Sequence, residues 1–218
     1  CAACFGAGGA GHYVKTVHNG IEYADMQMIA EIYGLMRDGQ GRNAADIGAI
    51  FARWNEGPLE SYLIEIAAEV STTTDAETGD AILDVIADRA GQKGTGRWTV
   101  IDAQTRAAPL PAVEAAVTAR VLSGEAALRD EGAALFPGNG PLGPVEDADL
   151  EAALLVGKIL AYSHGFTLLA RARVEEDWTM SLATVARTWR AGCIIRSAML
   201  DDMADALADE SEGQPLAF

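Results

Sequence analysis

The sequence predicts an all-α fold, and three features of its 218 residues support this prediction. Apolar residues make up 50% of the chain, and alanine and leucine outnumber the β-branched residues, which favours helices. Apolar side chains recur at helical spacing through most of the sequence. The pattern does not show the alternation of strands and helices that builds a nucleotide-binding sheet.

Helices are expected along nearly the whole chain. The first ends near Asp38–Gly39, and the second carries Ile47, Phe51 and Trp54 on one side. The third is expected to start at Gly57–Pro58, because proline is tolerated at the first position of a helix. In chain order, the expected ranges are 12–36, 44–55, a third helix from Gly57–Pro58, 82–88, 99–108, 111–123, 125–134, 147–175 and 179–208.

Polar or glycine-rich segments separate these helices. STTTDAETGD (71–80) predicts an exposed loop, GQKGTG (91–96) a second loop, and PGNGPLGPVED (137–147) a connector. The most apolar long stretch, 150–172, contains Lys158 as well as a histidine and an arginine. It therefore predicts a buried helix of a soluble protein, since a membrane span needs about 20 apolar residues with few charges.

The charge balance limits the classes of partner. A net charge of -16 argues against general nucleic-acid binding, because phosphate backbones require basic surfaces. Any site for a small anion must therefore gather the few cations locally, which directs attention to Lys15, Lys93, Arg120 and Arg196.

The three cysteines cannot form a complete disulfide framework. Cys1 and Cys4 form an isolated CxxC, a weak indication of zinc or redox use, and no metal site is expected. Cys193 lies in an apolar run and predicts a buried small hydrophobe. No secretion signal opens the sequence, so a cytoplasmic protein is expected.

One predicted helix face carries polar side chains where an apolar stripe is normally found. Lys15, His18, Asn19, Glu22 and Tyr23 follow the spacing i, i+3, i+4, i+7 and i+8 of one continuous face. A base, an imidazole, an amide, a carboxylic acid and a phenol together suit proton transfer and ligand binding. Spacing alone is more often that of a solvated helix face, and both interpretations are open at this point.

Three ordered blocks carry a family resemblance. GAGHYVKTVHNGIEYADMQ (9–27), IADRAGQKGTGRW (86–98) and TWRAGCIIRS (188–197) resemble motifs of the decarboxylating 6-phosphogluconate dehydrogenases. The similarity runs from about Gly8 to about Ala208. It implies the large helical C-terminal domain of that fold.

The resemblance also implies a reaction: oxidative decarboxylation of 6-phosphogluconate to ribulose 5-phosphate and carbon dioxide, with reduction of NADP, in the pentose phosphate pathway. By motif match, Lys15 is the base for the 3-hydroxyl proton and afterwards polarises the 3-keto oxygen. A lysine loses its proton more readily when it is buried or lies near the positive end of a helix. Glu22, about 10 Å further along the helix, is the acid that protonates the dienol, which requires a carboxyl pKa raised by burial.

The remaining site residues are assigned by the same match. His18 and Asn19 are expected to bind hydroxyl groups or the carboxylate. Lys93 and Thr95 of GQKGTG, with Tyr23 and Arg120, match the residues that hold the 6-phosphate. Taken alone, GQKGTG lacks the spacing of a P-loop and is typical of a surface turn. Arg196 suits a structural ion pair, and His12 and His164 are assigned to structure.

The family carries a dinucleotide-binding domain upstream and a tail downstream that contributes to the neighbouring subunit's site. The expected division is a glycine-rich lead-in from the missing domain (1–11), an all-helical catalytic and dimerisation domain (12–210) and a truncated tail (211–218). We expect a homodimer through helical surfaces, with NADP held by residues outside this chain and no nucleic-acid or membrane partner. The chain alone is expected to bind substrate weakly and to have little or no turnover.

Two other functions stay open. One is a β-hydroxyacid dehydrogenase for a smaller acid such as hydroxyisobutyrate, although Glu22, Tyr23 and GQKGTG argue against a substrate without phosphate. The other is a non-catalytic helical dimerisation module, which the intact motifs argue against.

Overall fold

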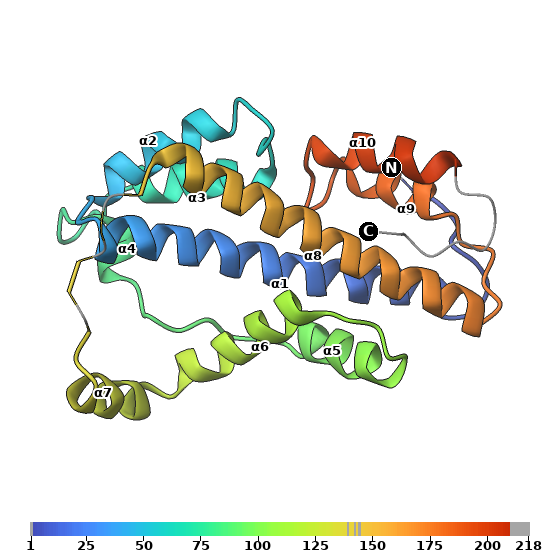
Figure 1. Cartoon of the computed structure of the whole chain (residues 1–218), viewed down its shortest axis with the longest axis horizontal. Helices are drawn as coiled ribbons and strands as arrows, with labels where there is room; N and C mark the ends of the chain where they lie inside the picture. The colour runs from blue at the N-terminus through green and yellow to red at the C-terminus, as the bar shows by residue number, and fades with distance from the viewer. Residues whose placement is uncertain (1, 139, 142, 144, 210–218) are drawn as a thin grey trace.

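The computed structural model describes residues 2–138, 140–141, 143 and 145–209, and the predicted all-α fold is confirmed (Figure 1). Within these residues, pairing of extended backbone is limited to two isolated bridges, Ser61 with Ser197 and Thr74 with Ala81. The described helices are α1 (Ala10–Gly34), its π-helical continuation η1 (Leu35–Gly39), α2 (Ala44–Trp54), α3 (Tyr62–Thr72), α4 (Ile82–Val85), α5 (Thr95–Thr105), α6 (Pro111–Gly124), α7 (Ala126–Leu135), α8 (Asp147–Glu175), α9 (Leu182–Trp189), α10 (Met199–Ala206) and the 3-10 turn η2 (Leu207–Asp209).

Two long helices, α1 and α8, lie side by side along the long axis of the molecule (Figure 1). The pair α2–α3 packs over one end of this axis, and the pair α9–α10 packs over the other end. On the opposite side, α5 and α6 pack against α1, and α7 extends from α6. Helix α1 therefore contacts α3, α5, α6, α8 and η1, and its polar face lies where α5 and α6 approach it.

The apolar side chains form two cores that both involve α1 and α8. The first core contains Val17 and Ile21 of α1, Phe166 of α8, and side chains of α9 and α10. The second contains Ile32 of α1, Leu154 of α8, and side chains of α2 and α3. The two long helices thus contribute their first and second halves to different cores.

A buried ion pair lies beside the cores. The Lys158 ammonium donates to both carboxylate oxygens of Asp25, each at 2.9 Å, and to the Ser61 hydroxyl at 3.2 Å. Lys158 and Asp25 are each 1% exposed. Because α8, α1 and the start of α3 all contribute to this cluster, it connects three elements at one point.

Helix α8 is, within the described residues, long and apolar enough to cross a membrane by length and composition. Its buried side chains include Leu154, Lys158, Ala161 and Phe166, which pack in the two cores or in the ion pair. One face of α8 therefore packs as a core face, as the sequence predicts, whereas Val156, Ile159 and Leu160 are exposed, so the helix is only partly buried.

Most predicted helix ranges agree with the structure, but the predicted start of the third helix at Gly57–Pro58 is wrong. Helix α3 begins at Tyr62, because the Ser61 side chain caps it by accepting a hydrogen bond from the Ile64 N–H. Residues 57–59 form a turn, and the buried Leu59 anchors that turn in the second core.

Two further predicted ranges are corrected. The single helix predicted for 179–208 is divided into α9 and α10, because the intervening turn contains Gly192 at a φ of 74° and pairs Ser197 with Ser61. Helix α5 starts at Thr95, four residues before the predicted start of 99–108, and this start lies inside the predicted loop 91–96.

Some predictions fall on residues that the structure does not describe. The predicted tail 211–218 and Cys1 lie outside the described part of the chain. Cys4, the other member of the predicted CxxC, is exposed and free. Cys193 is partly buried against the first core, where burial raises the pKa of its thiol.

Candidate functional site

The polar face of α1 forms a connected hydrogen-bonding group. The Lys15 Nζ lies 3.0 Å from His18 Nδ1, and the same ring nitrogen lies 3.1 Å from Asn19 Oδ1. The carboxylate of Glu22 reaches to 3.8 Å from His18 Nδ1. Three side chains of the predicted face therefore converge on the Nδ1 atom of a fourth, His18.

The imidazole of His18 is held in the fold rather than in solvent. Its ring is 2% exposed and meets the edge of the Trp189 ring, with centroids 5.6 Å apart. Burial, with the nearby Lys15 ammonium, lowers the pKa of His18 to about 4, so the ring is neutral at neutral pH. A neutral ring carries one N–H, so Nδ1 either accepts from Lys15 or donates to Asn19. The tautomer of His18 therefore decides which of the two contacts of Nδ1 is a hydrogen bond.

Glu22 is partly buried, and burial raises the pKa of its carboxyl group even though Lys15 and Arg120 act to lower it. Because His18 is neutral, its 3.8 Å contact with Glu22 is not an ion pair at neutral pH. A partly buried carboxyl group with a raised pKa is suited to hold and deliver a proton.

The loop 91–96 and α6 complete the site from the other side of α1. The Asn19 amide donates to the Thr95 hydroxyl at 3.1 Å, which ties the polar face to the start of α5. The Arg120 guanidinium lies over the Tyr23 ring, 3.9 Å from its centroid, and donates to the Gly91 carbonyl at 2.7 Å. These contacts join α1, the loop before α5 with the start of α5, and α6.

Lys93 lies in the same loop but is exposed, and no ion pair with it is found within the described residues. A cavity of about 460 Å³ opens beside the loop and is lined by Arg89, Gly91, Gln92 and Arg120 among others. The loop, the cavity and the polar face therefore gather positive charge and hydroxyl groups in a strongly acidic protein.

Contacts join most of the predicted site residues to one another. Lys93 is not part of this network but lies two residues before Thr95 in the same loop. The side chains in the network are Lys15, His18, Asn19, Glu22, Tyr23, Thr95 and Arg120. The individual roles of these residues stay predictions.

Two neighbours of this network were not predicted from the sequence. The Trp189 ring packs edge-on against the His18 ring, and the thiol of Cys193 interacts electrostatically with Lys15 and Glu22. Both residues belong to the block TWRAGCIIRS, so the block was informative although no site role followed from it. Thr99 of α5, whose hydroxyl group lies 2.9 Å from the Thr16 carbonyl of α1, was also not predicted, because this contact depends on how α5 packs against α1.

The residues assigned to structure have different surroundings. Arg196 forms an ion pair with Glu65 and lies over the Tyr62 ring at 5.0 Å, which confirms the predicted ion pair. His164 is partly buried and its pKa is lowered by burial, whereas His12 is exposed at the start of α1.

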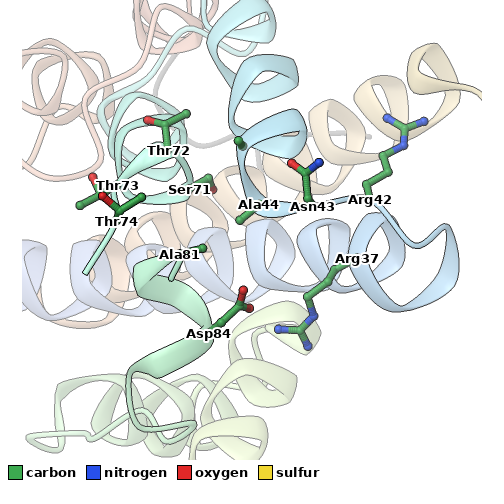
Figure 2. Close-up of a pocket in the computed structure, with 11 residues that line it drawn as sticks. Arg37, Arg42, Asn43, Ala44, Ser71, Thr72, Thr73, Thr74, Ala81 and Asp84 are labelled. Carbon is green, nitrogen blue, oxygen red and sulfur yellow. The ribbon is translucent and has the colours of Figure 1, made fainter. Parts of the chain in front are cut away.

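A second cavity, of about 440 Å³, lies between α2, α3 and α4 (Figure 2). Its lining includes Arg37 and Arg42, but Arg37 pairs with Asp38 and Arg42 pairs with Asp147. Asp84 also lines this cavity (Figure 2). The carboxylates of Asp38 and Asp147 therefore compensate the positive charge of the two arginines in this cavity, whereas Lys93 has no such ion pair among the described residues.

Comparisons with known proteins agree with this geometry. The family model described as "6-phosphogluconate dehydrogenase, C-terminal domain" matches residues 11–218. The chain is 45% identical over 224 residues to a decarboxylating 6-phosphogluconate dehydrogenase of Chlamydia pneumoniae, covering 100% of this chain and 47% of the relative. It is 42% identical over 217 residues to the NADP(+)-dependent, decarboxylating enzyme of Bacillus subtilis, covering 97% of this chain and 46% of the relative.

A solved structure of Plasmodium falciparum 6-phosphogluconate dehydrogenase matches with a TM-score of 0.93 and 40% identity, covering 98% of this chain and 47% of that one. That protein was solved without ligand, with NADP+ and with 6-phosphogluconate. The chain thus spans about half the length of the curated relatives that it matches.

Proposed function

Because this chain belongs to the 6-phosphogluconate dehydrogenase family, as its C-terminal domain, we propose that it supplies the helical side of a decarboxylating 6-phosphogluconate dehydrogenase site. The proposed reaction converts 6-phosphogluconate to ribulose 5-phosphate and carbon dioxide with reduction of NADP. The contact network between the polar face of α1 and the loop before α5 is the main support for this proposal.

Lys15 is the proposed base for the first step. As a neutral amine it takes the proton of the substrate's 3-hydroxyl while the hydride leaves C3. As the resulting ammonium it donates to the 3-keto oxygen, which accepts electrons when the bond between C1 and C2 breaks and carbon dioxide departs. The contact of 3.0 Å with His18 Nδ1 gives the Lys15 proton an alternative acceptor in the same place.

Glu22 is the proposed acid for the last step. Loss of carbon dioxide leaves an enediol, and the carbon that carried the carboxylate must take up a proton to give the ketose. The raised pKa of the Glu22 carboxyl group keeps a proton available at higher pH than an ordinary glutamic acid does. Its place on the same helix face, two turns from Lys15, suits a substrate that extends along α1.

The phosphate end of the substrate is proposed to lie at Lys93, Thr95 and Arg120, with Tyr23 beside them. Lys93 is exposed and forms no ion pair within the described part of the chain, Thr95 supplies a hydroxyl group, and Arg120 keeps donors beyond its bond to Gly91. A smaller acid without phosphate would leave this group of cations without a partner, which argues for the phosphorylated substrate.

NADP, when bound, supplies the acceptor for the hydride. The described residues do not fit a dinucleotide site, because no strand precedes the glycine-rich segment before α1 in this part of the chain. The nucleotide-binding portion is therefore proposed to lie outside this chain.

A homodimer is proposed through helical surfaces. Helix α7 has no buried side chain, and it extends from the rest of the molecule (Figure 1). Large apolar side chains are exposed on α5, α6 and α7 or directly after α7: Trp98, Ile101, Val121, Leu122, Leu128, Leu135 and Phe136. Exposed apolar area of this kind is typical of surfaces that associate with another chain.

Thermal unfolding with 6-phosphogluconate tests the proposed substrate. A ligand at 100 times its dissociation constant stabilises the folded state by about 2.7 kcal/mol, a shift that is easily measured. We expect a shift with 6-phosphogluconate, none with gluconate, and a much smaller shift in the variant Lys93→Ala. Equal shifts with both ligands would contradict the proposed phosphate site.

A further inference from the structure

Helix α5 meets the catalytic face of α1 through a row of polar contacts. Thr95, Thr99 and Asp102 follow one face of α5 at the spacing i, i+4 and i+7. Thr95 accepts from Asn19, and Asp102 accepts from the Tyr13 hydroxyl. The row runs antiparallel to α1, from Asn19 at one end to Tyr13 at the other.

Thr99 lies in the middle of this row and is 1% exposed. Its hydroxyl oxygen lies 2.9 Å from the Thr16 carbonyl of α1 and 2.9 Å from the Thr95 carbonyl of its own helix. The Thr16 carbonyl belongs to the residue directly after Lys15. Thr99 therefore bonds α5 to the backbone of α1 beside the proposed base.

The same contact is sterically close. A Cβ atom at Gly20 would lie 2.7 Å from the Thr99 Cγ2 atom, and a Cβ atom at Gly96 would lie 2.6 Å from the Tyr23 ring. Such separations are shorter than carbon atoms tolerate, so the two helices approach as closely as their glycines permit. A slip of α5 along α1 would bring these groups into collision.

The far end of α5 is fixed by charge. Arg106 donates to Asp102 at 2.9 Å, and it also pairs with Glu175 at 2.6 Å and Glu176 at 2.8 Å at the end of α8. Burial and the nearby Asp102 raise the pKa of the Tyr13 phenol, so that it stays a donor to Asp102. The row of contacts is thus held at both ends.

We propose that Thr99 is a positioning residue that sets the register of α5 on α1. The loop with Lys93 immediately precedes α5, whereas Lys15 and Glu22 lie on α1, so this register sets the distance between the phosphate-binding group and the acid–base pair. Thr99 acts through these elements and contacts no reacting group. The ligand that would reach both groups, 6-phosphogluconate, is taken from the proposed function, whereas the register of α5 on α1 does not depend on that function.

The test compares ligands of two lengths in three variants of this chain. Thr99→Val keeps the shape of the side chain and removes the hydroxyl, and Thr99→Ser keeps the hydroxyl. Thr105→Val is the matched control, because Thr105 lies on the same helix, is exposed, and donates only within α5, to the Ile101 carbonyl. The ligands are 6-phosphogluconate, which reaches both groups, and inorganic phosphate, which reaches one.

Dissociation constants would be measured by titrations followed in amide NMR spectra. We expect Thr99→Val to weaken 6-phosphogluconate about tenfold, equivalent to about 1.4 kcal/mol, and to change phosphate binding by less than about twofold. Thr99→Ser should recover most of the affinity, and Thr105→Val should match the unmodified chain. Unchanged 6-phosphogluconate binding in Thr99→Val, or equal weakening of both ligands, would overturn the inference.

A second readout needs no ligand and separates this inference from the proposed function. Gly96 lies against the Tyr23 ring, so its Hα resonances should carry a ring-current shift that reports the register. If the unmodified chain binds neither ligand, the proposed function fails, whereas a loss of this shift in Thr99→Val still supports the register. Retention of the full shift overturns the register.

If Thr99→Val does not fold, Thr99→Ser and Thr99→Ala take its place, because they differ by the hydroxyl alone. Loss of the ring-current shift in the alanine variant but not in the serine variant supports the register, and equal shifts in both variants overturn it.

Discussion

Helix α1 contributes residues to two clusters that each contain a lysine, one buried and one exposed. The closed cluster consists of Asp25, Lys158 and Ser61, and its lysine is 1% exposed and gives all its hydrogen bonds to protein groups. The open cluster consists of Lys15, His18, Asn19 and Glu22, and its lysine is exposed and, among the described residues, lies at hydrogen-bond distance from a neutral imidazole. The comparison teaches that a paired, buried lysine is committed to structure, whereas an exposed lysine without a carboxylate at ion-pair distance is available to a ligand.

The largest expected effect is on the closed cluster. Lys158→Met should lower the free energy of unfolding by about 3–5 kcal/mol, because it leaves the buried Asp25 carboxylate without its partner. The double variant Asp25→Leu with Lys158→Met should be clearly more stable than the single one, since no buried charge remains. Urea unfolding measures both variants. A single variant no less stable than the double one would show that this carboxylate is not isolated by burial.

The second effect comes from His18 and depends on pH. Its folded pKa of about 4 is below the unfolded value of about 6.5, so the unfolded state binds the proton more tightly. Stability from this group is complete above about pH 6.5 and is lost as the pH falls toward 4, by about 2–3 kcal/mol at pH 4.5.

The measurement compares the free energy of unfolding at pH 7 and pH 4.5 in the unmodified chain and in His18→Gln. The unmodified chain should lose the additional stability on acidification, while the contributions of other groups cancel in the difference. Equal losses in the two proteins would show that the imidazole is freely protonated in the folded state.

Glu22 should give a smaller effect of opposite sign. Its folded pKa is raised, so the folded state binds the proton more tightly, and stability falls as the pH rises from about 4.3 through the raised value. Glu22→Gln should therefore gain stability relative to the unmodified chain between pH 4 and pH 7. Thermal unfolding across this range checks the direction, and Glu31→Gln, on an exposed position of the same helix, is the control.

The smallest expected effect on stability is that of Lys15→Met, the counterpart of the lysine substitution in the closed cluster. Lys15 is exposed and forms no ion pair with a carboxylate among the described residues, so its removal should change the free energy of unfolding by less than about 1 kcal/mol. Urea unfolding provides the comparison with Lys158→Met. A loss as large as that of Lys158→Met would remove the distinction between the two clusters.

The open cluster could be predicted from the sequence, and the closed one could not. Lys15, His18, Asn19 and Glu22 lie within eight residues at helical spacing, so local geometry alone places them on one face. Asp25, Ser61 and Lys158 come from three distant segments, and only the packing of α1 against α8 brings them together. Thr99 was missed for the same reason.

The helix ranges show the same difference between features set by local sequence and features set by contacts between distant residues. The bounds 147–175 were predictable from a long apolar pattern, whereas the start of α3 was set by a Ser61 cap that competes with an equally plausible proline. The division between α9 and α10 depends on the pairing of Ser61 with Ser197, a contact between distant residues. The site roles of Lys93, Arg120 and their neighbours came from the family resemblance rather than from spacing.

Because α1 and α8 each pass through both cores, neither core can open without disturbing the other. Amide hydrogens in the middle of α1, around Asp25, should therefore exchange with solvent only when the whole chain unfolds. Helix α7 buries no side chain, so its amides can exchange through local fraying while the remainder stays intact. Folding cooperativity is thus concentrated in the two long helices, and the residues proposed for proton transfer belong to one of them.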